Sequence, residues 1–478
     1  MSIEAVKQLV RNAKRFELPA DEPPPELPDD FESSEAPLPP WMSEDALADE
    51  LVNQNGHALR WTHGMGWMLD NKQVWQRDAD MVHFDRARAV CRLASTQADD
   101  EKLQRRVASA ATVAAVVKLA QTDPRIVVPV ARWDADPFAL NTPGGIVDLR
   151  TGAMRRRGGG DYVTQMTTVA PDVNGAAPVF ERFMLEIFKG DIELVRFMQR
   201  ALGYCLTGDR REQVLLFAHG DGANAKSTFI DLVRKLTGSY ATNLPADELM
   251  AGRNEKHKTG IASLRGRRLA VSSELEEGQF WNESLLKSLT GDETMSARFM
   301  RQDFFEFNMT HKHVIVGNFK PRLRGGDPAM ARRLLLVPFE AKFEGDRRDK
   351  LMPAKLQAEA PAILGWMIRG AVKWHDNGLL PPERVRAASA EYLAEHDDLA
   401  LWADECCIRS GDGRASDLYA SFSLWKQSRG EHASSMTSWG SRVAGLPGLS
   451  KRKSHGTAVY TGLSLRSDEM EKIYAARR

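Results

Sequence analysis

A glycine-rich loop ending in lysine and serine carries the clearest chemical signal in this sequence. Residues 220–228 read GDGANAKST, after an apolar run typical of a buried strand and before a run typical of a helix. Loops of this kind bind phosphates through backbone N–H groups and the positive end of the helix. We expect Lys226 to reach the β- and γ-phosphates of ATP and Ser227 to ligate Mg²⁺. The predicted ATP-binding residues are Gly220, Asp221, Gly222, Ala223, Asn224, Ala225, Lys226, Ser227 and Thr228.

Ala225 stands where the phosphate-loop pattern G-x-x-x-x-G-K-[ST] has its second glycine. If this residue must adopt a positive φ, alanine costs about 1 kcal/mol, because its Cβ comes too close to the following carbonyl. If the residue is already helical, alanine is harmless. The sequence leaves both conformations open. A Gly/Ala-rich helix start that binds no ligand is the alternative explanation of the whole segment.

Acidic residues follow a second apolar run and could complete a nucleotide-hydrolysing site. The run RLAVSSE (268–274) ends in Glu274, and Glu276 comes two residues later. One carboxylate should hold Mg²⁺ through water, and another should polarise the attacking water. We expect Glu274 to be the main acid and metal ligand, with Glu276 as the second. Glu277 is interpreted as a solvated charge in a turn.

Polar residues also border the next two apolar runs. Asn318 ends the run HVIVGN and could orient the attacking water, with an ordinary turn asparagine as the alternative. Arg332 and Arg333 come at the start of the run RLLLVPF, where an arginine can reach the nucleotide of a neighbouring subunit. We expect one of the two to have this role, with a slight preference for Arg333. A pair of solvated charges at a helix end is the alternative.

The elements that must position these residues alternate between strand and helix. Four short runs rich in Val, Leu and Ile suit strands that are buried on both faces of a sheet. They are 214–220, 268–274, 313–318 and 333–339. Helical spacing of apolar residues is found in 85–120, 180–206 and 355–375. This alternation predicts an α/β core.

The chain divides into five predicted parts. They are an acidic, proline-rich disordered leader (1–40), a mixed α+β N-terminal domain (41–178), an ATPase core (179–350, with a helical lead-in over 179–212), a helical linker (351–398) and a winged-helix domain (399–478). The leader contains few residues able to form a core. Turn signals between short apolar runs in the N-terminal domain favour β-hairpins.

Composition and charge narrow the class of protein. Hydrophobic residues make up 42% and charged residues 27%, a soluble globular profile. Neither a membrane-spanning run nor a signal peptide is found, so we expect a cytoplasmic protein. The four cysteines form no CxxC pair, and neither a zinc site nor a disulfide framework is expected. Residues 1–50 contain 4 Lys/Arg and 13 Asp/Glu, so the remainder is basic and hints at a polyanionic partner.

Five stretches resemble the phage and plasmid primase-helicase family, the superfamily-3 AAA+ helicases of mobile elements and poxvirus-type replication proteins. They are LNTPGGIVDLRTG (140–152), GYCLTGDRREQVLLFAHGDGANAKSTF (203–229), SELEEG (273–278), LTGDETMSARFMRQDFFEF (289–307) and GNFKPRLRGGDPAMARRLLLVPF (317–339). The resemblance implies an AAA+ core that uses ATP and Mg²⁺ to unwind DNA. It also implies a hexameric ring that translocates on single-stranded or forked DNA. Asn318 would be the sensor, and the arginine finger would lie in AMARR.

The resemblance also bears on what else the chain contains. Members often carry an N-terminal primase, whereas here we expect the helicase part without a primase domain, acting with a separate primase or another replication protein. The acid pairs Asp78/Asp80 and Asp134/Asp136 resemble metal pairs only superficially, and a structural role is expected for Asp134/Asp136.

Two basic segments are candidates for contact with DNA. In the family, the segment before the Asn318 strand forms a hairpin that lines the central channel, and here it carries Arg298 and Arg301. Basic side chains there would contact backbone phosphates without reading sequence. In the tail, Ser416 and Ser435 are plausible N-caps of a winged helix, and a docking or dimerisation module is the alternative. The residues of the tail predicted to contact duplex phosphates are Arg442, Lys451, Arg452 and Lys453.

Three functions therefore remain open at this point. The first is a replicative DNA helicase of a phage, plasmid or integrated mobile element. The second is a non-unwinding AAA+ ring loader, which Ala225 keeps open. The third is an origin-binding initiator, which rests on the basic tail. A strand-displacement assay separates the first from the second.

Overall fold

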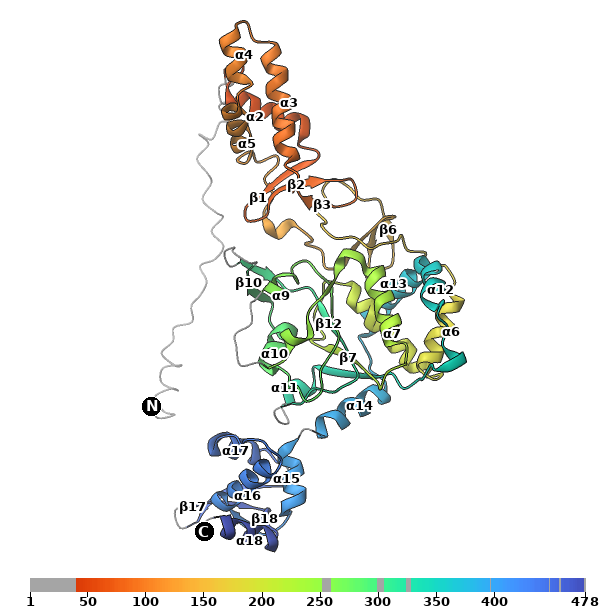
Figure 1. Ribbon diagram of the computed structural model, residues 1–478, viewed down its shortest axis with the longest axis vertical. Coiled ribbons are helices and arrows are strands. Elements are labelled where there is room, and N and C mark those ends of the chain that lie inside the picture. The colour runs from red at the N-terminus through yellow and green to blue at the C-terminus, as the bar shows by residue number, and fades with distance from the viewer. Residues whose placement is uncertain are drawn as a thin grey trace, which may run out of the picture. The chain divides into compact units, whose positions relative to one another are not determined.

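The computed structural model of the 478-residue chain (Figure 1) describes residues 40–251, 259–298, 305–323, 328–395, 397–446, 448–454 and 457–476. The predicted leader lies outside these residues except for Pro40, and Arg301 lies outside them as well. The chain forms two compact units: the described part of Met1–Trp61 with Asp78–Val127, and Thr62–Arg77 with Val128–Arg478. The five-part division of the sequence stays a prediction. Among the described residues, no helix has the length and apolar character needed to cross a membrane.

The first unit is built mainly from helices. They are α2 (Glu44–Asn55), α3 (Val82–Thr96), α4 (Glu101–Val107) and α5 (Ala110–Ala120), with β1 (Leu59–Thr62) after α2. Side-chain oxygens of Ser43, Asp100 and Ser109 accept backbone N–H groups at the starts of α2, α4 and α5. Asp78 accepts the N–H groups of Val82 and His83 in the same way. Asp78 therefore has a structural role at the start of α3.

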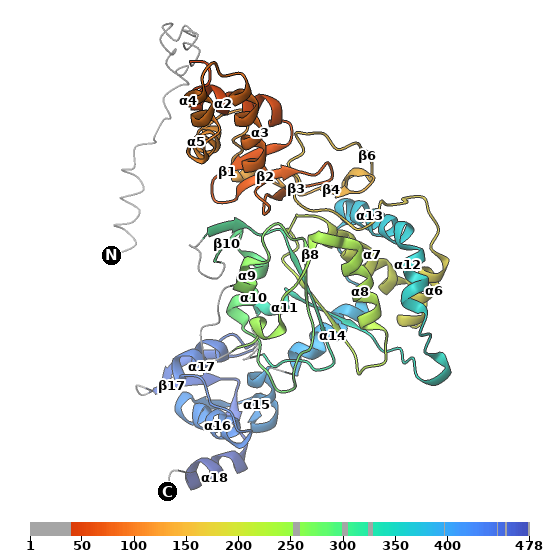
Figure 2. The same cartoon turned by 45° about the horizontal axis from the view of Figure 1, so that its top comes forward.

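A five-stranded parallel sheet forms the centre of the second unit. Its strands, in spatial order, are β13 (Leu334–Pro338), β7 (Leu215–His219), β12 (Lys312–Gly317), β9 (Leu269–Ser272) and β8 (Ala241–Asn243). The first four are the four predicted apolar runs, so this part of the prediction is confirmed. The edge strand β8 (Figure 2) was not predicted, because its three residues are partly exposed and show no apolar pattern.

Helices pack on both sides of this sheet. They are α6 (Pro178–Ile187), α7 (Ile192–Leu206), α8 (Lys226–Thr237), α9 (Thr259–Ala262), α10 (Glu283–Gly291), α11 (Pro328–Ala331), α12 (Met352–Ala358), α13 (Ala360–Asn377) and α14 (Glu383–Ala394). Two glycines allow α7 and α13 to approach closely. A Cβ on Gly203 would lie 2.0 Å from the nitrogen of Ala371, and one on Gly370 would lie 1.9 Å from the carbonyl oxygen of Gln199. The predicted helical segments 180–206 and 355–375 are confirmed.

Antiparallel hairpins surround the core. Strands β2 (Gly66–Asp70) and β3 (Trp75–Arg77) pair with each other, and β4 (Ala139–Thr142), β5 (Gly145–Asp148) and β6 (Met154–Arg155) form a three-stranded sheet. A third hairpin joins β10 (Thr294–Ala297) to β11 (Phe305–Asn308), with Thr294 opposite Asn308. The hairpins expected in the N-terminal domain and before the Asn318 strand are therefore present.

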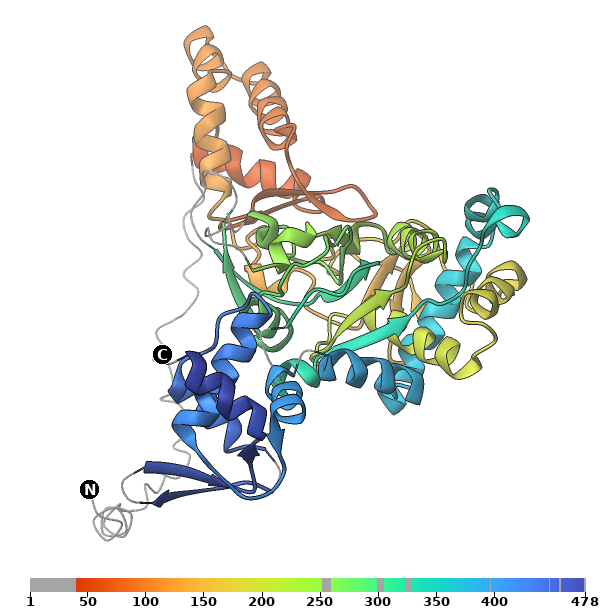
Figure 3. The ribbon, with the colours of Figure 1, turned by 60° about the horizontal axis from the view of Figure 1, so that its bottom comes forward.

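The C-terminal segment has its own small core around Trp402, Trp439 and Tyr460. Its elements are α15 (Asp398–Cys406), β14 (Cys407–Ile408), β15 (Asp412–Arg414), α16 (Ala415–Ser428), α17 (Met436–Val443), β16 (Ser450–Ser454), β17 (Thr457–Thr461), β18 (Ser464–Leu465) and α18 (Ser467–Ala476). The hairpin β16–β17 is dark blue in Figure 3. Ser435 caps α17 as predicted, but α16 already begins at Ala415, so Ser416 is inside the helix. The order of three helices and a hairpin agrees with the expected elements, and the winged-helix interpretation stays a prediction.

Candidate nucleotide-binding site

The predicted phosphate loop connects β7 to α8, and its backbone adopts an unusual conformation. Gly222 has φ = 96°, Ala223 has φ = 49° and Ala225 has φ = 62°, all in the left-handed region. The question left open for Ala225 is therefore answered: the residue needs a positive φ, which costs alanine about 1–2 kcal/mol. Strain of this kind concentrates at functional sites, where the surrounding structure holds it in place.

Contacts with the segment that follows β13 hold the loop in this shape. The Nδ2 of buried Asn224 donates to the carbonyl oxygen of Phe339 at 3.0 Å, and the N–H of Phe343 donates to the carbonyl oxygen of Ala223 at 2.7 Å. Gly220 leaves the room for this approach, because a Cβ there would lie 2.1 Å from the Phe339 oxygen. The segment after β13 was not predicted to take part, since it contains no recognisable motif.

Lys226 and Asn318 meet at one edge of the sheet. The Nζ of Lys226 donates to Asn318 Oδ1 at 3.0 Å and also to the carbonyl oxygen of Gly220. This ammonium group is buried, and the burial lowers the pKa of Lys226 to about 8. Lys226 begins α8 after the loop that leaves the carboxyl end of β7, and Asn318 follows the carboxyl end of the neighbouring parallel strand β12. Ligands bind at this edge in open α/β sheets.

His219 lies beside this pair and was not singled out from the sequence. Its Nε2 is 3.1 Å from the carbonyl oxygen of Asn318. Burial lowers the pKa of His219, so the ring is neutral at pH 7 and can donate this hydrogen bond from Nε2. His219 therefore helps to fix the backbone of Asn318. No motif marked it, because histidine at the end of a strand is not a recognised signal.

The two predicted acids follow β9, the other neighbour of β12. In the sheet register, Ser272 of β9 is opposite Ile315 of β12, and Ile315 is opposite Phe217 of β7. Glu274 comes two residues after Ser272. It therefore lies at the level of Gly317 and His219, which end β12 and β7. Glu274 is exposed and has φ = 67°, which adds a further strained position at this edge of the sheet. Glu276 is exposed too and accepts a hydrogen bond from Gln279 Nε2 at 3.1 Å.

A cavity of about 880 Å³ opens beside the loop, which is ample for a nucleotide. One wall is formed by residues 222–228 together with Asn318, and the opposite wall by α6 and the segment around the 3₁₀ helix Gly345–Arg347. Neither Glu274 nor Glu276 is part of the lining. The lining residues that the sequence did not predict are Arg182, Phe183, Glu186, Phe343, Arg347, Arg348, Asp349, Lys350, Met352 and Pro353. Four of them are basic, which suits a polyanionic ligand.

The two candidate arginine fingers have different surroundings. Arg333 is 9% exposed, and it donates from Nε to Thr290 Oγ1 and from Nη1 to the carbonyl oxygen of Ala329, each at 3.0 Å. Arg332 is exposed. A side chain that reaches another subunit must be accessible, so the geometry favours Arg332 and not Arg333, which the sequence analysis slightly preferred.

The candidate DNA contacts are on the β10–β11 hairpin, on helix α17 and on the β16–β17 hairpin. Arg298 is exposed directly after β10, and Arg301 lies outside the described residues. In the C-terminal segment, Arg452 forms an ion pair with Asp412 at 2.5 Å, and Arg442 Nη2 is 3.8 Å from Asp397 Oδ1. The Lys451 ammonium is 5.7 Å from the centre of the Tyr460 ring, and Lys453 is exposed.

Two family models match the chain. "D5 N terminal like" matches residues 45–189, and a family of unknown function, DUF5906, matches residues 218–333. A "Putative helicase" of Acanthamoeba polyphaga mimivirus is 21% identical over 321 residues, and a "Putative helicase" of Frog virus 3 is 24% identical over 283 residues. These matches support the resemblance to the phage and viral primase-helicase family.

The chain matches only part of each viral relative. The alignments cover 62% and 55% of the chain but 33% and 29% of the mimivirus and frog virus proteins, so it spans about a third of their length. Among solved structures, the apo C-terminal region of NrS-1 is 11% identical, with a TM-score of 0.49 over 88% of this chain and 99% of that one.

Proposed function

We propose that this chain is an ATP-driven DNA helicase that acts in the replication of a phage, plasmid or integrated mobile element. The observation that carries the proposal is the hydrogen bond from Lys226 Nζ to Asn318 Oδ1. A strained glycine- and alanine-rich loop, its lysine and a polar residue from the next strand thereby converge on one cavity. This arrangement suits binding and hydrolysis of a nucleoside triphosphate.

The residues that line the cavity, together with the two acids after β9 outside its lining, suit ATP and Mg²⁺. Backbone N–H groups at the start of α8 and the Lys226 ammonium would bind the β- and γ-phosphates, whose negative charge raises the pKa of Lys226 again. The Ser227 hydroxyl, which lines the cavity, and the Glu274 carboxylate are the hard oxygen donors that Mg²⁺ prefers. When bound, the metal neutralises charge on the phosphates. Asn318 would orient the attacking water, and Glu276 would assist Glu274.

A ring of subunits, which we propose to be hexameric, would complete the site. Arg332 is exposed, as required of a finger that reaches a neighbour's γ-phosphate. Arg298 on the β10–β11 hairpin would contact single-stranded DNA, together with Arg301. Duplex DNA at a fork would meet Arg442, Lys451, Arg452 and Lys453 of a winged-helix domain. The family also suggests cooperation with a separate primase.

Replacing Lys226 tests the site. Lys226→Ala should abolish ATP hydrolysis, because no other lysine is in the loop. Lys235→Ala is the matched control, since Lys235 is an exposed lysine in the last turn of the same helix. ATP hydrolysis and strand displacement on forked DNA should both be measured. Hydrolysis by Lys226→Ala within twofold of the parent would refute the assignment.

A second candidate function, which Ala225 keeps open, is a ring loader that binds ATP and DNA without unwinding. Binding of origin DNA by the C-terminal basic residues, as in an initiator, is compatible with either the helicase or the ring loader. Strand displacement distinguishes them: a loader would bind forked DNA with ATP but leave it annealed. An initiator would prefer one duplex sequence over others.

A further inference from the structure

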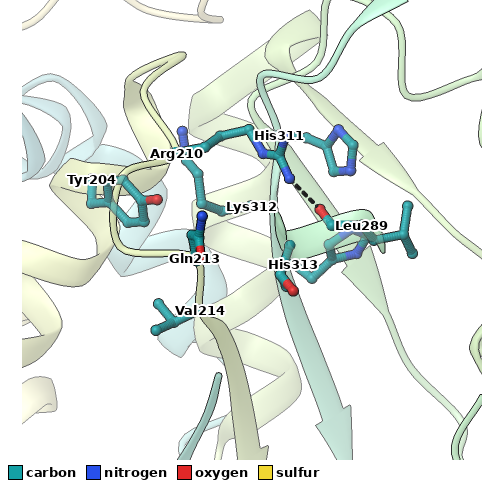
Figure 4. Close-up of a pocket in the computed structure, with 9 residues that line it drawn as sticks. Tyr204, Arg210, Gln213, Val214, Leu289, His311, Lys312 and His313 are labelled. Atoms are coloured by element: carbon teal, nitrogen blue, oxygen red, sulfur yellow. Dashed lines mark hydrogen bonds between the residues drawn. The ribbon is translucent and has the colours of Figure 1, made fainter. Parts of the chain in front are cut away.

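Arg210 holds the base of the β10–β11 hairpin. It lies in the turn between α7 and β7, and its guanidinium reaches across to the end of α10 (Figure 4). Nη2 donates to the carbonyl oxygen of Leu289 at 2.6 Å, and Nη1 donates to that of Asp292. The last carbonyls of a helix lack partners within the helix and attract cations. Asp292 is two residues before the first residue of β10, so this contact fixes where the hairpin starts.

The turn that carries Arg210 is fastened to the central strand β12. The fully buried Lys312, the first residue of β12, donates from Nζ to the carbonyl oxygens of Thr207, Asp209 and Thr310. Its ammonium also lies 4.8 Å from the centre of the Tyr204 ring. At the other end of the same strand, Asn318 contacts Lys226. Arg210 is thus one contact removed from the strand whose far end touches the nucleotide site.

The buried surroundings of Arg210 make it costly to break its hydrogen bonds to the Leu289 and Asp292 carbonyl oxygens. Arg210, His311, Lys312 and His313 line one small cavity of about 10 Å³, enough for a single water molecule (Figure 4). Burial lowers the pKa of Arg210, and it also lowers the pKa of both histidines, which are therefore neutral. If the Arg210 guanidinium lost its hydrogen bonds to the Leu289 and Asp292 carbonyl oxygens, its charge would be buried without hydrogen-bond acceptors, which is unfavourable.

We infer that Arg210 is a positioning residue that couples β12 to the β10–β11 hairpin. Movement of Asn318 on ATP hydrolysis would pass along β12, through Lys312 to the 207–213 turn, and through Arg210 to the hairpin that carries Arg298. The expected effect on unwinding rests on the proposed helicase function. The position of Arg210 against the hairpin rests on the hydrogen bonds alone. Arg210 touches neither the nucleotide cavity nor a DNA candidate residue.

Variants at two neighbouring arginines test the inference. Arg210→Met keeps the length of the side chain and removes its charge, and Arg210→Lys keeps the charge but can reach only one of the carbonyls. Arg211→Ala is the control, because Arg211 pairs with Asp209 and lies over the Trp374 ring instead of α10. In Arg210→Met we expect basal ATP hydrolysis within about twofold of the parent and unwinding reduced at least about tenfold. The unwinding rate of Arg210→Lys should lie between those of the parent and Arg210→Met. Arg210→Lys replaces Arg210→Met in the test if Arg210→Met does not fold.

Hydrogen exchange provides a readout that needs no activity. Amides of Asp292–Ala297 should exchange about tenfold faster in Arg210→Met than in the parent, and at the parent rate in Arg211→Ala. Unchanged exchange in Arg210→Met would overturn the inference. An equal fall in basal hydrolysis and unwinding would also overturn it, because Arg210 would then act on overall stability. A parent protein without ATP hydrolysis would refute the proposed function, and the exchange comparison would then decide the Arg210 contact by itself.

Discussion

Ala225→Gly should stabilise the protein, although the same substitution destabilises the interior of a helix. Ala225 has φ = 62° and ψ = 11°, where a Cβ costs about 1–2 kcal/mol. Glycine removes this cost but makes the unfolded chain more flexible, which costs about 0.4–1 kcal/mol. The net gain should be about 0.5–1 kcal/mol in the free energy of unfolding. The gain requires no new contact, since the loop already has this conformation.

An alanine in an ordinary helix supplies the control of opposite sign. Ala387 is exposed in the interior of α14, and Ala387→Gly should lower the free energy of unfolding by about 1 kcal/mol. Urea unfolding of both variants, followed by tryptophan fluorescence, gives the two shifts in midpoint. A midpoint for Ala225→Gly at or below that of the parent would refute the claim that this backbone is strained.

The same variant bears on the choice between helicase and loader. Because the loop already holds the strained conformation, Ala225→Gly should change the rate of ATP hydrolysis by less than about threefold. A rise above about tenfold would mean that Ala225 restrains hydrolysis in the parent, as a loader would require. Strand displacement by the same samples shows whether unwinding follows hydrolysis.

Three further predictions address the acids, the fingers and pH. Glu274→Gln should retain ATP binding, measured with a fluorescent analogue, and lose turnover; full turnover would exclude Glu274 as the main acid. When Arg332→Ala is mixed with the parent protein, total ATP hydrolysis should fall by more than the fraction of the variant in the mixture; a strictly proportional loss would exclude a role between subunits. Arg333→Ala should mainly lower the stability of the protein, since Arg333 donates hydrogen bonds to Thr290 and Ala329. Burial lowers the pKa of His311 far below its ordinary value and that of His313 to about 3, so the unfolded chain binds more protons below pH 6.5. Stability should therefore fall from pH 6.5 towards pH 4 by roughly 1 kcal/mol per histidine per pH unit, and urea midpoints that do not change over this range would contradict it.

Much of the fold could be predicted because its signals are local. The four apolar runs became β7, β9, β12 and β13, since residues buried on both faces of a parallel sheet need no partner information to be recognised. The loop at 220–228 was found for the same reason, because its glycines, lysine and serine are adjacent in the sequence. The edge strand β8 escaped prediction, as three partly exposed residues have no period.

Contacts between distant residues decided the rest. The sequence determined that Ala225 stands where the loop pattern has a glycine. Its positive φ was decided by the geometry of the β7–α8 connection and by the backbone hydrogen bonds of Phe339 and Phe343 to the loop. The sequence also determined that two arginines precede β13. Which of them is accessible depends on Thr290, more than forty residues away in the chain. Local sequence specifies strands, helices and turns through short-range sterics and periodicity, whereas burial and hydrogen-bond partners are properties of the packed chain.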